Sequence, residues 1–550
     1  MDTFNRTVTL IIELLLVAAL VAILVRRLRI PYTVALVVAG LAITLRQPLQ
    51  LNLTPELFLI VFLPPLVFEA AFHINLSSLR RDLLPIALLA GPGVILTMLI
   101  VGGLLAQTTR LSLPIALVFG ALISATDPVS VVALFRRLGV PRRLGVLVES
   151  ESLLNDGTAI VLFNLVLGYA LAGKVDGLLA VGDFIRVSAG GILVGLGLGW
   201  VVSLLIGRLD DHLIETTLTT VLAYGAYLVA DRLGFSGVLA VVAAGLINGN
   251  IGRSGMSPTT RIVVFNFWEY FAFLSNSMVF LLIGLQVNIS SLLADWQPIL
   301  WAVLGVLASR AIVVFGLGTL ANRLSRRADQ LPVTWLQVAS WGGLRGAIAL
   351  ALALSLPISL GPDRALLQAM AFGVVLFTLL VQGTTMSPLI HRLGVIQRSE
   401  TQEAYAVQHA RLTSIRSATH HLDRLHREGL VPTSIWDALK PGLDDRIQAI
   451  TSEVREVVRS SPDLYADELD TARREFLRAQ RSALQGLLRE GLITEDVFSQ
   501  LAAEVDFYLD QPADELEEPA AVTPAWLLQA ESRGEPAEDL GEAKDHERIQ

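Results

Sequence analysis

Long apolar stretches separated by short polar loops fill the first 400 residues of this 550-residue chain. A helix of about 20 apolar residues can cross a lipid bilayer, where every backbone amide and carbonyl needs a partner within the protein. Hydrophobic residues make up 53% of the chain and charged residues only 17%. The sequence therefore predicts an all-α polytopic membrane protein embedded in a lipid bilayer. Thirteen candidate transmembrane helices lie near residues 8–25, 31–47, 55–73, 83–106, 112–135, 145–170, 183–207, 213–231, 235–250, 262–287, 297–320, 332–356 and 366–390.

Basic residues are distributed unequally among the loops between these spans. With the N-terminus outside the cell, the inward-facing loops hold 17 arginines, and the outward-facing loops hold 7 arginines and lysines together. Cytoplasmic loops of membrane proteins are enriched in Lys and Arg. We therefore expect an odd number of spans, the N-terminus outside and the C-terminal tail in the cytoplasm. The first run, Thr9–Val25, lacks a small-residue cleavage site, so we expect it to be retained as the first helix.

The net charge changes sign near residue 400. Residues 1–400 carry 26 Lys and Arg and 20 Asp and Glu, whereas residues 401–550 carry 16 and 30. We expect a transmembrane domain over 1–397, a cytoplasmic tail of helical hairpins over 398–510 and an acidic, disordered C-terminus over 511–550. In the tail, Arg427–Val431 recurs 62 residues later as Arg489–Ile493, which predicts two similar hairpins. The sequence does not identify a ligand for the tail.

Composition excludes several classes of function. The chain has no cysteine, which rules out disulfides, thiol catalysis and thiolate metal sites. It also lacks a basic patch of the kind that nucleic-acid binding requires, so no nucleic-acid partner is expected. His73, His212 and His391 fall at the ends of spans and do not cluster. We therefore expect no cofactor.

Two aspartates lie inside the fifth and sixth spans. Asp127 has long apolar runs on both sides, and Asp156 precedes the charge-free stretch Gly157–Gly168. An ionisable residue at this depth costs roughly 2.5–3.5 kcal/mol on insertion, so it usually serves a function. Asp156 shares a helix face with Ser152, four residues earlier, and Thr126 is adjacent to Asp127. Hard cations prefer such oxygen ligands, so we predict a small-cation site. The structural alternatives are a helix–helix hydrogen bond for Asp156 and a helix cap for Asp127.

The fifth and twelfth spans both contain a helix-breaking sequence. Pro128 lacks an amide hydrogen and is favoured as a first helical residue, with Asp127 as the cap before it. The segment Gly342–Gly346 holds three glycines in five residues, and glycine is the poorest ordinary helix former after proline. Each span is thus expected to form two half-helices. If spans 1–6 and 8–13 are inverted repeats, the breaks are equivalent and indicate the midplane site of a secondary transporter.

Four motifs in this order resemble those of the NhaP/NHE-type monovalent cation:proton antiporters. They are Phe62–Phe72, Thr126–Pro128, Glu151–Asp156 and Gly342–Gly346, and the resemblance covers about residues 8–395. It implies thirteen helices in inverted repeats with two broken crossing helices, as in the NhaA-like antiporter fold. It also implies a homodimer in which a six-helix core moves against a dimerisation domain.

The resemblance implies a sodium/proton antiporter rather than an enzyme. Such a protein would export Na+ or Li+ in exchange for H+ by alternating access, for pH and sodium homeostasis, across the inner (plasma) membrane of a bacterium. A proton and a sodium ion can compete for one site because burial disfavours a charged carboxylate. A potassium/proton antiporter of the same fold is the nearest alternative. A channel or sensor is another class, and an intramembrane hydrolase using Ser152 is disfavoured because no histidine lies near the centre of a span.

Supporting roles follow for the residues around these aspartates. Asn155 stands where electrogenic relatives carry an aspartate, so the resemblance implies electroneutral exchange. The Asn155 amide is expected to hold the broken fifth span by hydrogen bonds. Glu151 and Arg345 are expected to form a buried ion pair, because an arginine inside the membrane needs a partner. Arg310 is expected to have a structural role near half-helix carbonyls, supporting the ion site.

Two further carboxylates are candidates for the access path of the ion. Glu149 is expected either in an inward-facing ion funnel or at the edge of the membrane. Glu69 is expected either in a contact between helices or along the access path. The sequence alone leaves both alternatives open.

Overall fold

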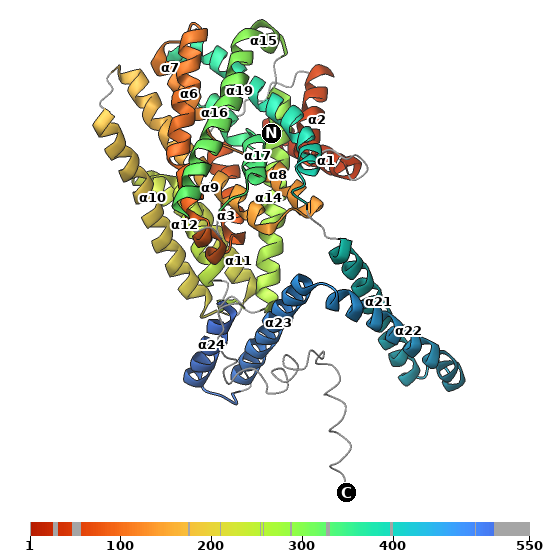
Figure 1. Cartoon of the computed structure of the whole chain (residues 1–550). Coiled ribbons are helices and arrows are strands. Elements are labelled where there is room, and N and C mark those ends of the chain that lie inside the picture. Colours follow the sequence, from red (N-terminus) through yellow and green to blue (C-terminus); the bar gives the residue numbers. More distant parts are fainter. Residues whose placement is uncertain are drawn as a thin grey trace. The chain divides into compact units, whose positions relative to one another are not determined.

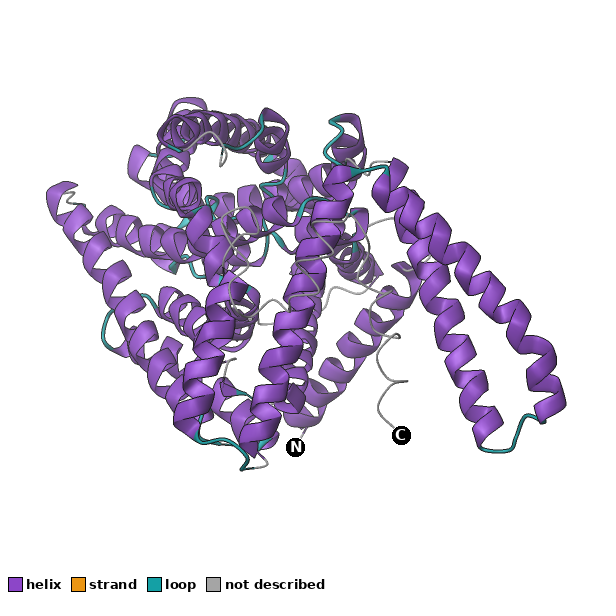
Figure 2. Cartoon of the chain, turned by 60° about the horizontal axis from the view of Figure 1, so that its bottom comes forward, coloured by secondary structure: helices purple, strands orange, loops and turns teal. Residues whose placement is uncertain are grey.

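The computed structural model describes residues 2–25, 31–46, 57–173, 177–209, 211–252, 255–256, 258–286, 289–325, 330–396, 400–489 and 491–510. All regular structure in these residues is helical (Figure 2). The chain forms two compact units, Met1–Ile396 and Gln397–Gln550. The acidic C-terminus predicted over 511–550 lies outside the described residues.

The helices of both units are numbered in chain order, and most of them are labelled in Figure 1. In the first unit they are α1 (Asp2–Val25), α2 (Tyr32–Arg46), α3 (Leu63–His73), α4 (Leu76–Arg81), α5 (Leu83–Ala90), α6 (Pro92–Thr108), α7 (Leu113–Leu122), α8 (Val129–Leu138), α9 (Arg142–Ala172), α10 (Gly177–Ile206), α11 (His212–Arg232), α12 (Gly237–Ile247), α14 (Pro258–Gln286), α15 (Ile289–Ala294), α16 (Trp296–Leu324), α17 (Val333–Trp341), α18 (Ala347–Leu354), α19 (Pro362–Phe377) and α20 (Gly383–Arg392). In the second unit they are α21 (Glu400–Arg427), α22 (Thr433–Arg459), α23 (Pro462–Arg489) and α24 (Glu495–Asp510).

Within the described residues, seven helical segments are long and apolar enough to cross a bilayer. They are Leu83–Thr108, Arg142–Ala172, Leu179–Ile206, His212–Arg232, Thr260–Gln286, Trp296–Leu324 and Pro362–Arg392. Shorter apolar helices cover Ile12–Val25, Tyr32–Leu45, Ile60–His73, Leu113–Leu122 and Gly237–Gly252. The predicted span near 332–356 contains the short helices α17 and α18. The prediction of an all-α polytopic membrane protein is confirmed.

Helices of the first unit pack into two groups. The site bundle consists of α5–α9 and α16–α20, in which α6 packs along α7 and α16, and α7 along α9. The flanking bundle consists of α1–α3, α10–α12 and α14, in which α2 packs along α14, and α10 along α12. Contacts within each bundle are more extensive than contacts between the two.

Small residues bring the helices of the flanking bundle close together. Gly191, Gly195 and Gly199 recur every four residues along α10. A Cβ atom on Gly195 would collide with the Ala240 carbonyl oxygen in α12, one on Gly191 would collide with that of the N-cap Ser236, and one on Gly199 would lie 3.0 Å from Ala244 Cα. In a bilayer, helices associate through such close packing, because lipid tails are as apolar as leucine. The glycine row therefore fixes α10 against α12.

Both predicted helix interruptions are present. Residues 123–128 separate α7 from α8, and residues 342–346 separate α17 from α18. Non-helical backbone at membrane depth is tolerated only where protein or a water-filled cavity supplies its hydrogen-bond partners. Here the breaks partner each other, because the Asp127 amide donates to the Leu344 carbonyl oxygen at 2.8 Å. The two interruptions therefore lie in direct contact.

The second unit repeats one helical hairpin. α21 packs on α22, and α23 packs on α24. Gly429 and Gly491 follow the first helix of each pair with φ of 74° and 70°, a left-handed conformation that favours glycine. In both turns the next amide donates to a carbonyl five residues earlier, at 2.9 Å for Leu430 and 3.0 Å for Leu492. The two copies of the duplicated sequence thus form the same turn.

Candidate ion-binding site

Asp127 lies in the break between α7 and α8, one residue before Pro128, the N-cap of the second of these helices. Its Oδ1 accepts a hydrogen bond from the Val129 amide at 3.0 Å. The first amides of a helix lack intrahelical partners, and a short acidic side chain satisfies one of them. Pro128 contributes no amide hydrogen, so it adds no further orphan donor at this end. The sequence thereby holds the Asp127 carboxylate at the start of α8.

Glycine is required where the second break meets the first. A Cβ atom on Gly346 would overlap the Asp127 carboxylate, and one on Gly343 would lie 2.7 Å from Arg310 Nε. Only a residue without a Cβ atom allows this approach. The glycines of the twelfth span therefore make room for the ion-site residues in addition to breaking a helix.

Arg345 binds backbone carbonyls of the break that follows α7. Its Nη1 donates to the carbonyl oxygens of Ser124 at 2.6 Å and Ala125 at 3.1 Å. Both carbonyls belong to the non-helical break, where no helix supplies a donor, so the buried guanidinium satisfies them. The Arg345 amide also donates to Thr378 Oγ1 at 3.1 Å. This arginine therefore joins the two breaks to Thr378, the residue that follows α19.

Glu151 pairs with Arg310, so the predicted pair with Arg345 was wrong. Arg310 Nη1 and Nη2 donate to Glu151 Oε1 and Oε2 at 2.8 and 2.9 Å, a bidentate arrangement. The Nε and Nη2 atoms also donate to the Ala339 carbonyl oxygen, near the end of α17, at 3.3 and 3.2 Å. Both arginines lie inside predicted spans, and the sequence does not show which guanidinium faces α9.

Polar side chains of α9 face the break in the fifth span. Asn155 Nδ2 donates to Thr126 Oγ1 at 2.9 Å, and Thr126 Oγ1 also lies 2.9 Å from Ser152 Oγ. Asp156 is 8% exposed, and its Oδ1 has no hydrogen-bond partner among the described residues. A buried carboxylate oxygen without a partner is costly. The site therefore leaves this carboxylate oxygen available to a proton or cation.

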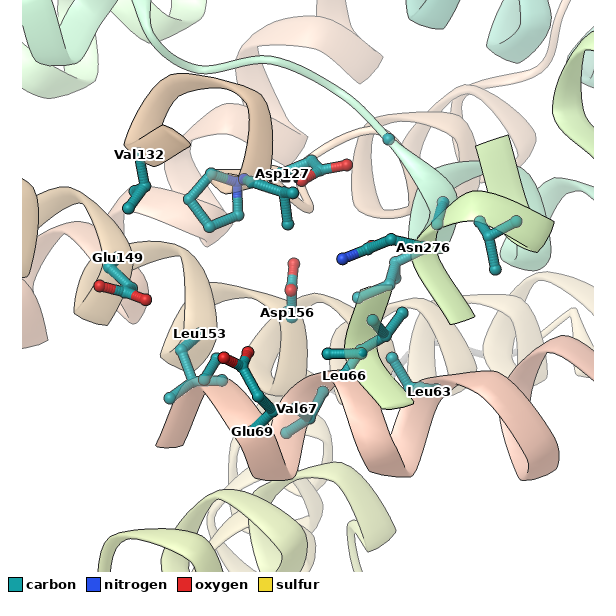
Figure 3. Close-up of a pocket in the computed structure, with 18 of the residues that line it drawn as sticks. Leu63, Leu66, Val67, Glu69, Asp127, Val132, Glu149, Leu153, Asp156 and Asn276 are labelled. Carbon is teal, nitrogen blue, oxygen red and sulfur yellow. Dashed lines mark hydrogen bonds between the residues drawn. The ribbon is translucent and has the colours of Figure 1, made fainter. Parts of the chain in front are cut away.

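A cavity of about 510 Å³ reaches both aspartates. Glu69 of α3, Glu149 of α9 and Glu269 of α14 line it together with Asp127 and Asp156. Figure 3 shows the carboxylate of Asp156 pointing into the space below Asp127, with Glu69 and Glu149 to one side. The rest of the wall is mainly apolar. The structure thus places both candidate access-path residues in one cavity with the aspartates.

Sequence patterns do not mark three other polar residues that line this cavity. Glu269 and Asn276 lie seven positions apart on α14, which is about two helical turns and so one helix face. That spacing within an apolar span is the signal from which they could have been found. Arg136, in the last turn of α8, also lines the cavity, and its Nη2 lies 3.7 Å from Glu149 Oε1.

Residues 15–392 match the family described as "Sodium/hydrogen exchanger, transmembrane". The chain belongs to this family. The exchanger is 41% identical over 484 residues to the Na(+)/H(+) antiporter ApNhaP of Aphanothece halophytica, which covers 87% of this chain and 91% of the relative. It is 36% identical over 481 residues to the low-affinity Na(+)/H(+) antiporter NhaS1 of Synechocystis sp., which covers 86% and 90%.

The fold of the exchanger is similar to that of a solved structure. The sodium proton antiporter MjNhaP1 from Methanocaldococcus jannaschii aligns with a TM-score of 0.59 at 22% identity, covering 71% of this chain and 99% of that one. Together with the sequence matches, this confirms the resemblance to NhaP-type antiporters. The family consists of secondary transporters, so the exchanger is a carrier and not an enzyme.

Proposed function

We propose that this exchanger exports Na+ or Li+ in return for H+, one for one, by alternating access. The observation that carries the proposal is the unpartnered Oδ1 of Asp156, which lies in the same cavity as Asp127. The hydroxyls of Thr126 and Ser152 lie beside these carboxylates and complete a set of hard oxygen ligands. ApNhaP and NhaS1 are named for sodium, which favours sodium over the potassium alternative.

Charge balance around the site supports one-for-one exchange. When ionised, Asp127, Asp156 and Glu151 carry three negative charges, and Arg310 and Arg345 carry two positive ones. The remaining single negative charge is neutralised by one sodium ion or by one proton. Moving a net charge through a low-dielectric interior is costly, so the loaded carrier crosses more easily than the empty one. An aspartate in place of Asn155 would double the net charge.

The finer architecture is part of the same proposal. Thirteen crossings in inverted repeats, as in an NhaA-like fold, are supported by the apolar helices and by the contact between two broken spans. The site bundle would be the moving core, and the flanking bundle would form the dimer interface of a homodimer. The exchanger would serve pH and sodium homeostasis in the inner membrane, with its N-terminus outside and its tail in the cytoplasm.

We assign the mouth of the cavity to the cytoplasmic side. Arg136 lines the cavity and belongs to an arginine-rich segment that the positive-inside rule places in the cytoplasm. Glu69, Glu149 and Glu269 line the same cavity. These glutamates and the two aspartates outnumber Arg136, so the cavity carries an excess of acidic groups when they are ionised, and such an excess within low-dielectric walls raises the local concentration of cations. The three glutamates would thus attract cytoplasmic sodium toward Asp156.

Flux measurements in proteoliposomes test this function. Na+ and Li+ are expected to dissipate an imposed pH gradient, and K+ is expected to fail. Asp156→Asn should abolish the response while the protein still inserts, because an amide does not titrate. Asp363→Asn, in the first turn of α19, is the matched control and should exchange at near wild-type rate. Near wild-type exchange by Asp156→Asn would contradict the proposed site, and equal rates with K+ would contradict the ion assignment.

A further inference from the structure

Hydrogen bonds on the site bundle leave one side of Asp156 unoccupied. Thr126, Ser152 and Asn155 bond to one another. The Oδ1 atom of Asp156 has no partner among the described residues. Because Asp156 lines the cavity, a group on the opposite wall can approach it.

Asn276 stands on that opposite wall. It belongs to α14, which packs along α2 and against α3 in the flanking bundle. Its side chain points into the cavity toward Asp156 (Figure 3). Its neighbours on the wall, Ala272, Phe273 and Val279, are apolar. A polar amide among apolar neighbours costs free energy unless it finds a partner, and the Asp156 carboxylate is the group that it faces.

We propose that Asn276 is a further residue of the ion site, supplied by the flanking bundle. A carboxamide has both a hydrogen-bond donor and an acceptor. The amide NH2 of Asn276 donates to Asp156 when the site is empty, and its oxygen turns toward the cation when sodium is bound. Amide oxygens are ordinary ligands of hard cations. This role rests on the proposed exchange of sodium for protons at Asp156.

The effect of Asn276 is confined to one side of the membrane. Asp127 and Asp156 belong to the site bundle, whereas Asn276 belongs to the flanking bundle. When one bundle moves against the other and this cavity closes, the aspartates keep their neighbours on α7–α9 but leave Asn276. The amide therefore stabilises sodium that enters through this cavity, and it does not act on sodium that enters from the opposite side.

Sided transport measurements with Asn276→Ala test the proposal. Exchange is measured in inside-out and right-side-out vesicles over a range of sodium concentrations. The apparent KM for sodium should rise about tenfold on the cavity side, as expected for the loss of a hydrogen bond or ligand to a charged group. The maximal rate, and the KM on the other side, should stay near wild type. Asn276→Gln, which keeps the carboxamide, should recover part of the affinity.

Asn266→Ala is the matched control, because Asn266 is an exposed asparagine of the same helix outside the cavity lining. It should leave both KM values unchanged. An unchanged KM in Asn276→Ala on both sides, or an equal rise on both sides, would overturn the proposal.

Binding of radioactive sodium to the protein in detergent separates this inference from the function on which it rests. Absence of exchange by the wild-type protein would refute the proposed function. Weaker sodium binding by Asn276→Ala than by the wild type would still support the role of Asn276. Equal binding by the two proteins would overturn it.

Discussion

Replacing Glu151 or Arg310 with glutamine is expected to destabilise the site bundle strongly, but not equally. Removing one partner of a buried ion pair typically costs about 3–5 kcal/mol, because the survivor is left charged and unpaired. Their side chains are 2% and 7% exposed, so water cannot replace the lost partner. Arg310→Gln removes both bonds to Glu151, whereas after Glu151→Gln the guanidinium still donates to the Ala339 carbonyl. We therefore expect Arg310→Gln to cost the larger amount.

Reversible unfolding of the detergent-solubilised protein measures this difference. The double variant Glu151→Gln, Arg310→Gln leaves no orphan charge, so it should recover part of the summed loss. The coupling free energy is expected to be about 2–3 kcal/mol, the upper part of the range for residues in one network. A second cycle of Glu151→Gln with Arg345→Gln is the control and should show a much smaller coupling, because Arg345 binds the Ser124 and Ala125 carbonyls. Stronger coupling of Glu151 to Arg345 than to Arg310 would refute the assignment.

Three other changes separate the parts of the proposed mechanism. Gly346→Ala should lower sodium-driven flux by about a hundredfold, because the added Cβ displaces the Asp127 carboxylate. Gly316→Ala is the control, because a Cβ atom at Gly316 meets no neighbouring atom. Equal flux in the two variants would contradict the reasoning. A potential set with valinomycin should leave the equilibrium sodium distribution unchanged. Each net charge moved would shift it by about 2.3 kcal/mol per 100 mV, so any clear shift excludes one-for-one exchange. Truncation after residue 400 should leave flux and sodium selectivity intact, since Asp127 and Asp156 lie upstream. If the truncated protein folds but loses its selectivity for sodium, the tail belongs to the transport path.

Local chemistry made part of this structure predictable from sequence. The two helix breaks follow from Pro128 and from the glycines of Gly342–Gly346, because proline and glycine disfavour a helix at the positions where they occur. The importance of Asp127 and Asp156 follows from the cost of a carboxylate inside an apolar span. These arguments need no knowledge of which helices are neighbours.

Contacts between distant segments were not predictable in the same way. Glu151 and Arg310 are 159 positions apart, and only the packing of α16 against α5, α6 and α17 brings the Arg310 side chain within reach of α9. The spacing of Asn276 and Glu269 places them on one face of α14, but only the packing of this helix shows that the face borders the cavity. A single sequence shows which residues share one face of a helix, but it does not show which other helix that face contacts.

The hydrogen bond from the Asp127 amide to the Leu344 carbonyl imposes an order on biogenesis. Its two partners are 217 positions apart in the chain. At about 5–20 residues per second, the ribosome takes roughly 10–40 s to reach the second partner after the first. During that interval the broken fifth span lacks its partner, and each unpaired backbone group in lipid costs several kcal/mol. The fifth span therefore reaches its final state only after the twelfth is inserted, and the first six spans alone should not form an ion-binding module.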